Sequence, residues 1–381
     1  MSQFDLTEEQ IAIRDMAHAF ATENLAPHAL SWDEHKHFPV EVLREAAALG
    51  MGGIYVREDA GGSGLTRFDA ALIFEALSTG DPTIAAYLSI HNMVAWMIDR
   101  FGSEEQRRLY VPKLSSMSFL GSYCLTEPNA GSDAAALKTR ALRDSEYYVL
   151  NGQKQFISGA GTSDIYVVMV RTGGDGPSGI SALVVPSDTK GLSFGANERK
   201  MGWNAQPTRA VIFEDARVPV ANRLGEEGQG FKIAMAGLDG GRLNIAACSL
   251  GGAQAAFDKA LNYMRERKAF GKTLTDFQAL QFRLADMATE LAAARLFLYA
   301  AASAYDGGHP ETTMRCAMAK RFVTDIGFKV ANEALQLHGG YGYLSEYGIE
   351  KIVRDLRVHQ ILEGTNEIMR LIIARKLIAE G

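Results

Sequence analysis

Apolar residues recur every three or four positions through roughly the first third of the chain. This period predicts amphipathic helices, and glycine-rich breaks separate them. Thr7, which precedes two glutamates, is suited to cap the first helix. The helical runs lie at 11–20, 41–49, 67–79 and 83–101. We therefore expect residues 1–120 to form an N-terminal helical domain.

The pattern changes at residue 121. Short stretches of β-branched and apolar residues now alternate with turn sequences such as Asn151-Gly152 and RTGGDGPSG. The intervals are mostly too short or too rich in turn residues for crossover helices. The candidate strands are 147–150, 165–170, 180–185 and 210–213. Residues 121–230 therefore predict a middle domain of antiparallel strands, a β-barrel or sandwich.

Helical spacing returns from residue 231 to the C-terminus. Small and apolar residues step by three or four along 250–264, and 281–304 is rich in helix-forming Ala, Leu and Arg. The loop at 305–311 is expected to join two antiparallel helices. Residues 231–381 therefore predict a C-terminal helical bundle. The whole chain is expected to be a multi-domain α+β protein in the order α, β, α.

Composition argues against several classes of partner. The 381 residues carry a formal net charge of -6, so no basic surface for nucleic acid is expected. No run of about 20 apolar residues predicts a membrane span. The N-terminus MSQFDLTEEQ lacks the basic and apolar regions of a signal peptide. A bacterial cytoplasmic protein is expected, although a mature mitochondrial matrix chain would look the same.

Two patterns of potential chemistry receive a structural interpretation. Cys124, Cys248 and Cys316 are far apart among apolar or small residues, which predicts buried free thiols. The histidines and cysteines show no zinc-ligand spacing, so no metal site is expected. The glycines at 174, 176 and 179 match a dinucleotide pattern, but a strand-like run follows them. We interpret them as a hairpin turn.

Two motifs in the middle segment have the chemistry of a ligand site. YCLTEPNAGS, at 123–132, combines hydroxyl groups with a small-residue turn whose backbone N–H groups suit an anion such as a pyrophosphate. A polar interdomain loop is the alternative. Phe156-Ile157-Ser158 ends a predicted strand, where an aromatic ring and a hydroxyl could flank a flavin. Aromatic residues in strands more commonly belong to a core.

Two further motifs end predicted helices. In RERKAFG, at 265–271, Arg267 and Phe270 could hold a phosphate and an adenine, or Arg267 could simply complement the helix dipole. In QLHGGYGYL, at 336–344, Gly339 suits a helix C-cap. The Gly339-Gly340 pair also permits close approach of a ligand to the backbone. For both motifs a plain helix end remains an alternative.

Glu363 precedes the last predicted helix and follows two apolar residues. It could be an ordinary negative charge at a helix N-terminus. It could instead point into an apolar pocket, where its pKa would rise and it would act as a base. Sequence spacing alone does not choose between these interpretations.

Four motifs together resemble the acyl-CoA dehydrogenase family, in order and spacing, over nearly the whole chain. They are YCLTEPNAGSD (123–133), RKAFGK (267–272), QLHGGYGY (336–343) and QILEGTNEIMR (360–370). The resemblance implies a helical domain, a middle β domain and a C-terminal four-helix bundle. It also implies FAD, an acyl-CoA substrate, an electron-transferring flavoprotein as electron acceptor, and a homotetramer, a dimer of dimers, whose subunits share FAD.

The resemblance implies site residues in all three segments. FAD contacts fall on Tyr123, Leu125, Thr126, Gly131, Ser132, Phe156, Ile157, Ser158, Arg267, Phe270, Phe277, Gln278, Gln336, Gly339, Gly340, Thr365, Asn366 and Glu367. Contacts to CoA and substrate fall on Ser132, Asp239, Arg242, Gly364 and Arg375.

The same resemblance implies that Glu363 is the catalytic base, which takes the α proton while the flavin takes the β hydride. Most family members place the base in an EGT or EGS sequence. One branch places it immediately before the arginine that matches Arg242, where this chain has Gly241. The segments 200–225, 238–253 and 276–289 resemble the branch that converts isobutyryl-CoA to methacrylyl-CoA in valine degradation.

Other functions remain open at this stage. Butyryl-CoA and 2-methylbutyryl-CoA are alternative substrates, because one methyl group in an apolar pocket is worth only about 1–3 kcal/mol. An acyl-CoA oxidase would pass the electrons to oxygen, although such oxidases are often longer. A catalytically inactive scaffold with the family fold would have lost the base or the FAD loop, and both are present in this sequence.

Overall fold

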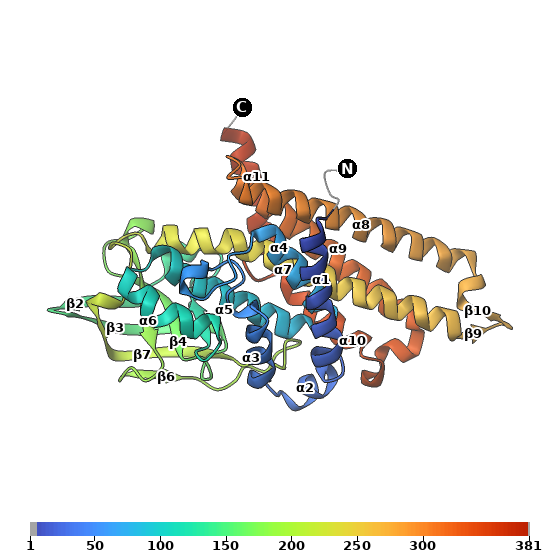
Figure 1. The fold of residues 1–381 in the computed structure, drawn as a ribbon, viewed down its shortest axis with the longest axis horizontal. Coiled ribbons are helices and arrows are strands. Elements are labelled where there is room, and N and C mark those ends of the chain that lie inside the picture. Colours follow the sequence, from blue (N-terminus) through green and yellow to red (C-terminus); the bar gives the residue numbers. More distant parts are fainter. Residues whose placement is uncertain (1–5, 380–381) are drawn as a thin grey trace.

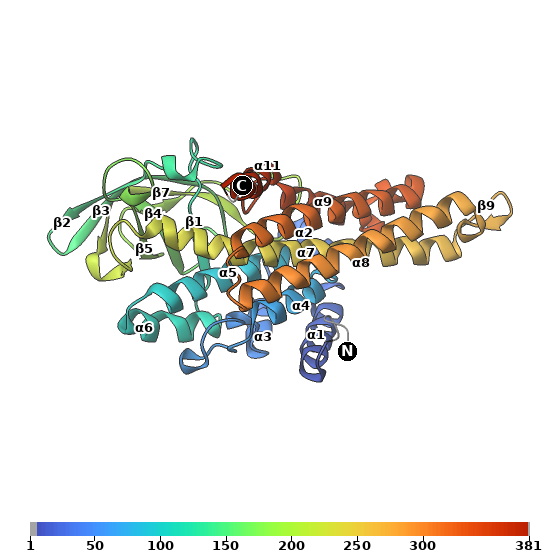
Figure 2. The ribbon, with the colours of Figure 1, turned by 90° about the horizontal axis from the view of Figure 1, so that it is seen from above.

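The computed structural model describes residues 6–379. A β domain lies at one end of an elongated molecule, and long helices extend away from it (Figures 1 and 2). The N-terminal helices pack between these parts. Their bounds are α1 (Glu8–Phe20), α2 (Ala29–His35), α3 (Val40–Ala48), α4 (Arg67–Ser78), α5 (Pro82–Phe101) and α6 (Glu104–Ser115).

Hydroxyl caps fix the starts of several N-terminal helices. Thr7, Thr66 and Ser103 each accept a hydrogen bond from the backbone N–H three residues later, at α1, α4 and α6. In each capping box the side chain at that third position, a Gln or an Asp, reaches back to the cap's N–H. The cap predicted at Thr7 is therefore confirmed.

The middle segment forms one eight-stranded sheet in the order β6-β7-β3-β2-β4-β5-β8, with β1 beside β4. Most neighbours are antiparallel, but β1 runs parallel to β4. The hairpin predicted between β4 and β5 is confirmed. The strands are β1 (Gly121–Cys124), β2 (Arg140–Asp144), β3 (Tyr147–Ser158), β4 (Ile165–Arg171), β5 (Ile180–Pro186), β6 (Leu192–Phe194), β7 (Thr208–Pro219) and β8 (Arg223–Leu224).

Strand β4 is apolar from residue 165 to residue 170 because both of its faces are buried. Ile165, Val167 and Met169 join a core shared with α5, α6 and α7. Tyr166 and Val168 alternate with them and face a second core, which residues of β3, β5 and β7 complete. The sheet therefore curls around one core while it packs its other face on helices.

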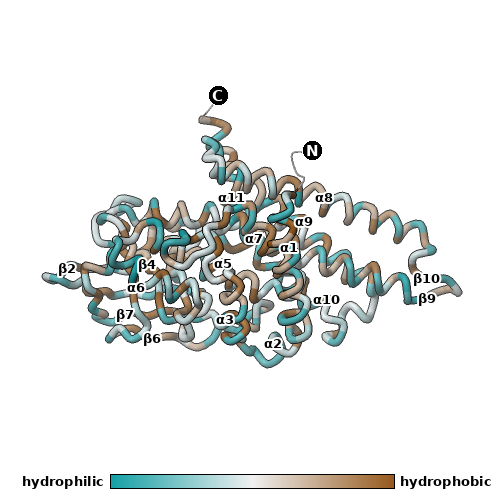
Figure 3. Tube along the Cα trace, in the orientation of Figure 1, coloured by the Kyte–Doolittle hydropathy of each residue, from teal (hydrophilic) through white to brown (hydrophobic). Residues whose placement is uncertain are grey.

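Three long helices make up most of the C-terminal segment. Helix α7 (Gly230–Glu266) meets α8 (Gln278–Asp306) through the hairpin of β9 (Lys268–Ala269) and β10 (Lys272–Thr273), and α9 (Thr312–His338) returns beside both. Helices α10 (Ile349–Arg357) and α11 (Asn366–Ala379) pack on α9. Hydrophobic residues gather where α4, α5, α7, α8 and α9 pack together (Figure 3). The predicted α, β, α fold class is confirmed.

Helix α7 begins where helical spacing was predicted to return and runs unbroken through a glycine-rich stretch. Those glycines permit close helix packing: at Gly251 a Cβ would overlap the Glu75 carbonyl oxygen of α4. The three cysteines are buried and free, as predicted. Within residues 6–379, no helix is long and apolar enough to cross a membrane. No three His, Cys, Asp or Glu side chains of those residues gather as a metal-binding group.

Candidate active site

Glu363 lies in the loop between α10 and α11 with an unusual backbone. Its φ is 55°, and Gly364 follows at 87°, so two consecutive residues adopt the left-handed conformation. A side chain at positive φ costs free energy that the surrounding structure must offset. This residue therefore stands before α11 and not within its first turn, and its side chain does not follow the helix.

The carboxyl group of Glu363 points inward. Its Oε2 atom is buried and has no hydrogen-bond partner among the described residues. Burial raises the pKa of Glu363 to about 7, although the positive charges of Arg242 and Lys320 act to lower it. A buried carboxyl group that titrates near neutrality is suited to accept a proton from a weak carbon acid.

Helix α7 supplies the space that this carboxyl group occupies. A Cβ at Gly241 would lie 2.8 Å from Oε2 of Glu363, so any side chain there would displace the carboxylate. The next residue, Arg242, is buried and donates from Nε to the Glu363 carbonyl oxygen at 3.3 Å. Its Nη1 donates to Asp239 at 2.6 Å. The predicted residues Asp239, Arg242, Glu363 and Gly364 thus meet at one place.

The first motif of the β domain approaches the same carboxyl group. The Tyr123 hydroxyl on β1 is buried and, within residues 6–379, has no hydrogen-bond partner. Burial raises the pKa of Tyr123 well above its usual value, and the charge of Glu363 adds to this effect. The loop that follows β1 carries Leu125, which is buried, and Thr126, which is half-buried. Gly131 and Ser132 at its far end are exposed.

A buried ion pair holds this loop. Lys154 on β3 is fully buried and donates from Nζ to the Glu127 carboxylate at 2.7 Å and to the Leu125 carbonyl at 3.1 Å. Glu127 also accepts from the backbone N–H groups of Lys138 and Thr139. Burial acts to raise the pKa of Glu127, but the Lys154 ammonium and these donors lower it overall.

The end of strand β3 presents the second motif. Phe156 adopts a φ of 60° and is 63% exposed, although it is a large aromatic residue. Ile157 turns inward and is buried. The Ser158 hydroxyl is half-buried and accepts a hydrogen bond from Gln206 Nε2 at 3.2 Å. The expected core alternative is therefore wrong for Phe156, whose ring faces outward.

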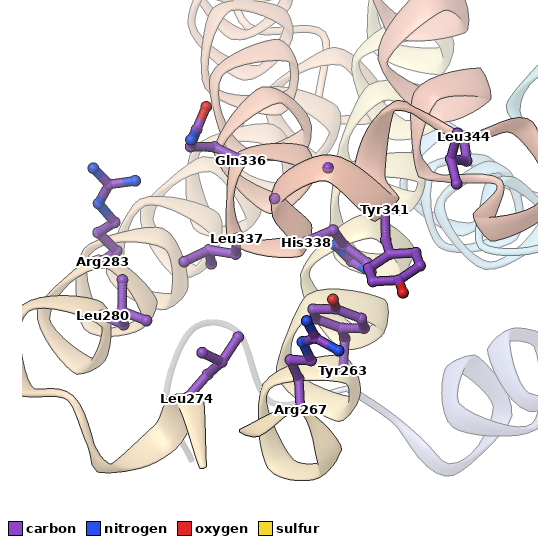
Figure 4. Close-up of a pocket in the computed structure, with 12 residues that line it drawn as sticks. Tyr263, Arg267, Leu274, Leu280, Arg283, Gln336, Leu337, His338, Tyr341 and Leu344 are labelled. Atoms are coloured by element: carbon purple, nitrogen blue, oxygen red, sulfur yellow. The ribbon is translucent and has the colours of Figure 1, made fainter. Parts of the chain in front are cut away.

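Four of the other predicted residues, Arg267 among them, line a pocket at the far ends of α7 and α9. The cavity has a volume of about 600 Å³, and Figure 4 shows Tyr263 and Arg267 beside His338 and Tyr341, with the Tyr263 ring stacked on His338. Gln336, Gly339 and Gly340 also line it. Gly339 caps α9, as predicted. Phe270, at the tip of the adjacent hairpin, forms an edge-to-face pair with Phe277, which precedes Gln278 at the start of α8.

Sequence profiles of known families match nearly all of the chain. The N-terminal, middle and C-terminal domains of acyl-CoA dehydrogenases match residues 7–118, 122–216 and 228–378. The chain belongs to the acyl-CoA dehydrogenase family. Members of this family are FAD-dependent enzymes that act on the CH–CH bond of an acyl-CoA.

Individual proteins are also similar to this chain over most or all of their length. Isobutyryl-CoA dehydrogenase, mitochondrial, of Bos taurus is 56% identical over 98% of this chain and 90% of its own. The structure of butyryl-CoA dehydrogenase from Megasphaera elsdenii is 40% identical, with a TM-score of 0.96 over 99% of this chain and 100% of its own. A structure described as PigA with FAD and proline is 30% identical, with a TM-score of 0.96 and complete coverage of both chains.

The residues present fit the FAD of an acyl-CoA dehydrogenase. Gly131, Gly339 and Gly340 have open space where a Cβ would stand, so a ligand can approach their backbone. The exposed Phe156 ring and the unpartnered Tyr123 hydroxyl leave groups for a flavin to cover or bond. These groups lie on different elements and border two surfaces. At neither surface does a neighbouring side chain of the described residues occupy the space beside them.

Some predicted residues lie elsewhere, and two buried lysines were not predicted. Glu367 and Arg375 are exposed on α11, while Thr365 caps that helix by accepting from Ile368 N. Asn366 is buried and bonds Lys320 of α9. Neither Lys320 nor Lys154 was a candidate. A signal existed for both, because each lysine falls in phase with buried neighbours along its helix or strand.

Proposed function

We propose that this acyl-CoA dehydrogenase oxidises a short branched acyl-CoA, isobutyryl-CoA, to methacrylyl-CoA, with Glu363 as the base. One observation carries the assignment of the base: the buried Oε2 atom of the half-buried Glu363 has no hydrogen-bond partner among the described residues and faces Gly241 on α7. A base carried at position 241 would reach into the same space. The glycine there leaves Glu363 as the only carboxylate of these two positions.

Glu363 removes the proton next to the thioester carbonyl. Its dry surroundings keep the carboxylate poorly solvated and therefore basic. FAD held by the residues named below would supply the acceptor for the hydride of the β carbon. Arg242 fixes the backbone of Glu363 through the hydrogen bond to its carbonyl oxygen, and Gly241 leaves room for the carboxylate because it has no side chain. The α carbon of the substrate therefore meets a preorganised base.

The remaining predicted residues would hold FAD and substrate. The β1 loop, with Tyr123, Leu125 and Thr126, and the end of β3 would surround the flavin ring, and Gly131 and Ser132 would meet phosphate or CoA. The pocket at Arg267, Gln336, Gly339 and Gly340 would take another part of FAD. Asp239 and Arg242 lie beside the base and would contact the substrate, together with Gly364. Glu367 and Arg375 are exposed, and they would contact FAD and CoA, respectively, at the rim of the site.

We also propose a homotetramer that shares FAD between subunits and passes electrons to an electron-transferring flavoprotein. Arg242 and Tyr263 are separated by 21 residues of α7, which is about 30 Å at 1.5 Å per residue. The Glu363 region and the Arg267 pocket of one chain therefore stand far apart. Phe270 and Tyr343 beside that pocket are 94% and 85% exposed, which favours an interface there. A location in the bacterial cytoplasm stays a prediction.

The pH dependence of flavin reduction tests the base. Because the pKa of Glu363 is raised to about 7, the carboxylate is mostly protonated and inactive below that pH. We expect the single-turnover rate of flavin bleaching to rise about tenfold per pH unit below 7 and to level off above it. Stopped-flow absorbance from pH 5.5 to 9 measures this. A flat profile across that range would contradict the assignment.

A substrate panel tests the acyl group. We expect kcat/KM for isobutyryl-CoA to exceed that for butyryl-CoA by about tenfold or more, because a branched methyl group that fits an apolar pocket contributes about 1–3 kcal/mol. The assay compares isobutyryl-, 2-methylbutyryl- and butyryl-CoA with an artificial electron acceptor. A preference for the linear butyryl-CoA would overturn the isobutyryl assignment and leave the reaction type standing.

A further inference from the structure

Two buried cations hold consecutive carbonyl groups of the strained loop that carries the base. Arg242 of α7 donates to the carbonyl of Glu363 at 3.3 Å, and Lys320 of α9 donates from Nζ to the carbonyl of Gly364 at 2.8 Å. Both residues of the loop have positive φ. The contacts from two different helices therefore oppose relaxation of the left-handed backbone, which would turn the carboxylate away.

Lys320 is the more unusual of the two cations. Its side chain is fully buried, and its two acceptors are neutral groups, the Gly364 carbonyl and the Asn366 Oδ1 atom at 2.9 Å. Asn366 is fixed in turn, since its Nδ2 donates to Thr324 and Asp325. A buried ammonium without an adjacent carboxylate is costly, so its place beside the base calls for a functional explanation.

Arg242 does not supply the same free charge. Its guanidinium is paired with Asp239 at 2.6 Å, and Asp239 also accepts from Thr313. Arg242 also lowers the pKa of Glu363, but its guanidinium is already part of an ion pair. Lys320 remains as the positive group near Glu363 that, among the described residues, forms no ion pair of its own.

We propose that Lys320 is a positioning residue for the base: its buried ammonium holds the Gly364 carbonyl and supplies the unpaired positive charge that favours the Glu363 carboxylate. This inference rests on the proposed role of Glu363. It adds a residue of α9, distant in sequence, to the machinery of the loop.

The charged and titratable groups around this pair are few. Arg242 from α7 and Tyr123 from β1 face Glu363. Asp325 of α9 and Glu367 of α11 act on Lys320 from the other side, and His359 lies near it as a buried ring whose pKa burial lowers to about 3. Burial lowers the pKa of Lys320 to about 7, while Glu363 favours its charged form. The pair therefore titrates as a unit.

Lys320→Met removes both the positive charge and the donor to the Gly364 carbonyl, whereas Lys320→Gln removes the charge and keeps a donor. In both variants we expect FAD to stay bound, KM for isobutyryl-CoA to change little, and the pH midpoint of flavin bleaching to move upward by about one unit. The rate should recover at high pH. Lys329→Met is the control, because that lysine of α9 is exposed and pairs only with Glu290.

Three results would overturn the inference. In the first, the pH midpoint of flavin bleaching in Lys320→Gln equals that of the native enzyme. In the second, the rate falls equally at every pH. In the third, neither variant both retains FAD and unfolds cooperatively. The last two outcomes would make Lys320 a residue of the fold alone. Failure of the base itself would be seen separately, as near-normal turnover of Glu363→Gln.

Discussion

Glu363→Gln is expected to keep FAD and lose at least about 10³-fold in the rate of flavin reduction by isobutyryl-CoA, within the range that general bases contribute. Glutamine fills the same space beside Gly241, where a larger group would collide, so the pocket should keep its shape. An amide cannot take the α proton at neutral pH. Stopped-flow bleaching of the flavin measures the loss, and its visible absorbance before mixing measures FAD content.

Stability provides the internal control for this variant. The folded protein favours the protonated form of Glu363, because its pKa is raised to about 7. Between about pH 4.5 and 7 the unfolded chain loses this proton while the folded protein keeps it, so the native enzyme loses folding free energy over that range and the glutamine variant does not. The melting temperature of Glu363→Gln should therefore exceed that of the native protein increasingly from about pH 4.5 to 7, and the difference should level off above pH 7. Near-normal turnover would remove Glu363 from the reaction, whatever the melting curves show.

Lys154→Met is expected to lower the free energy of unfolding by about 3–5 kcal/mol, since it leaves a buried carboxylate without its cation. The lysine is fully buried, and its ammonium joins the Glu127 carboxylate to the Leu125 carbonyl. Loss of both bonds frees the loop after β1, so FAD should dissociate more readily as well. Urea unfolding and flavin retention on gel filtration measure the two effects.

A second substitution separates the charge from the packing. Lys154→Met combined with Glu127→Gln should recover part of the loss, because no uncompensated carboxylate then remains. Arg217→Met is the matched control for an exposed pair: Arg217 and Asp144 are each about half exposed, and their pair should contribute less than about 1 kcal/mol. A cost at Lys154 no larger than at Arg217 would contradict the role given to the buried pair.

Periodicity predicted the three-part fold because helix and strand bury their faces with different repeats. The change from a period near 3.6 to short apolar runs marked the start of the β segment, and the structure places β1 at Gly121–Cys124. Periodicity does not show which elements pack together. Helix α7 runs unbroken through glycines such as Gly251, which packs directly on α4, and a lone sequence shows no partner for that residue.

The lysines show the same limit at the site. Lys154 and Lys320 each fall in phase with buried residues, yet lysine is rarely buried without a partner. Their partners lie 27 and 44 residues away along the chain, at Glu127 and Gly364. The sequence showed that each lysine is in phase with buried residues. It did not show the hydrogen-bond acceptors that make the burial of each ammonium group tolerable.

The sequence by itself determined the order of the helical and β segments, and its family resemblance predicted which motifs hold FAD and substrate. For Glu363 it left two interpretations open, a charge at the start of a helix or a buried base. Only the tertiary structure decided where that carboxyl group points, because the answer depends on the left-handed backbone at Glu363, the vacancy at Gly241 and the cation on α9. The burial of one atom and the electrostatic field at that atom depend on residues that are distant in the sequence, and only folding brings those residues together.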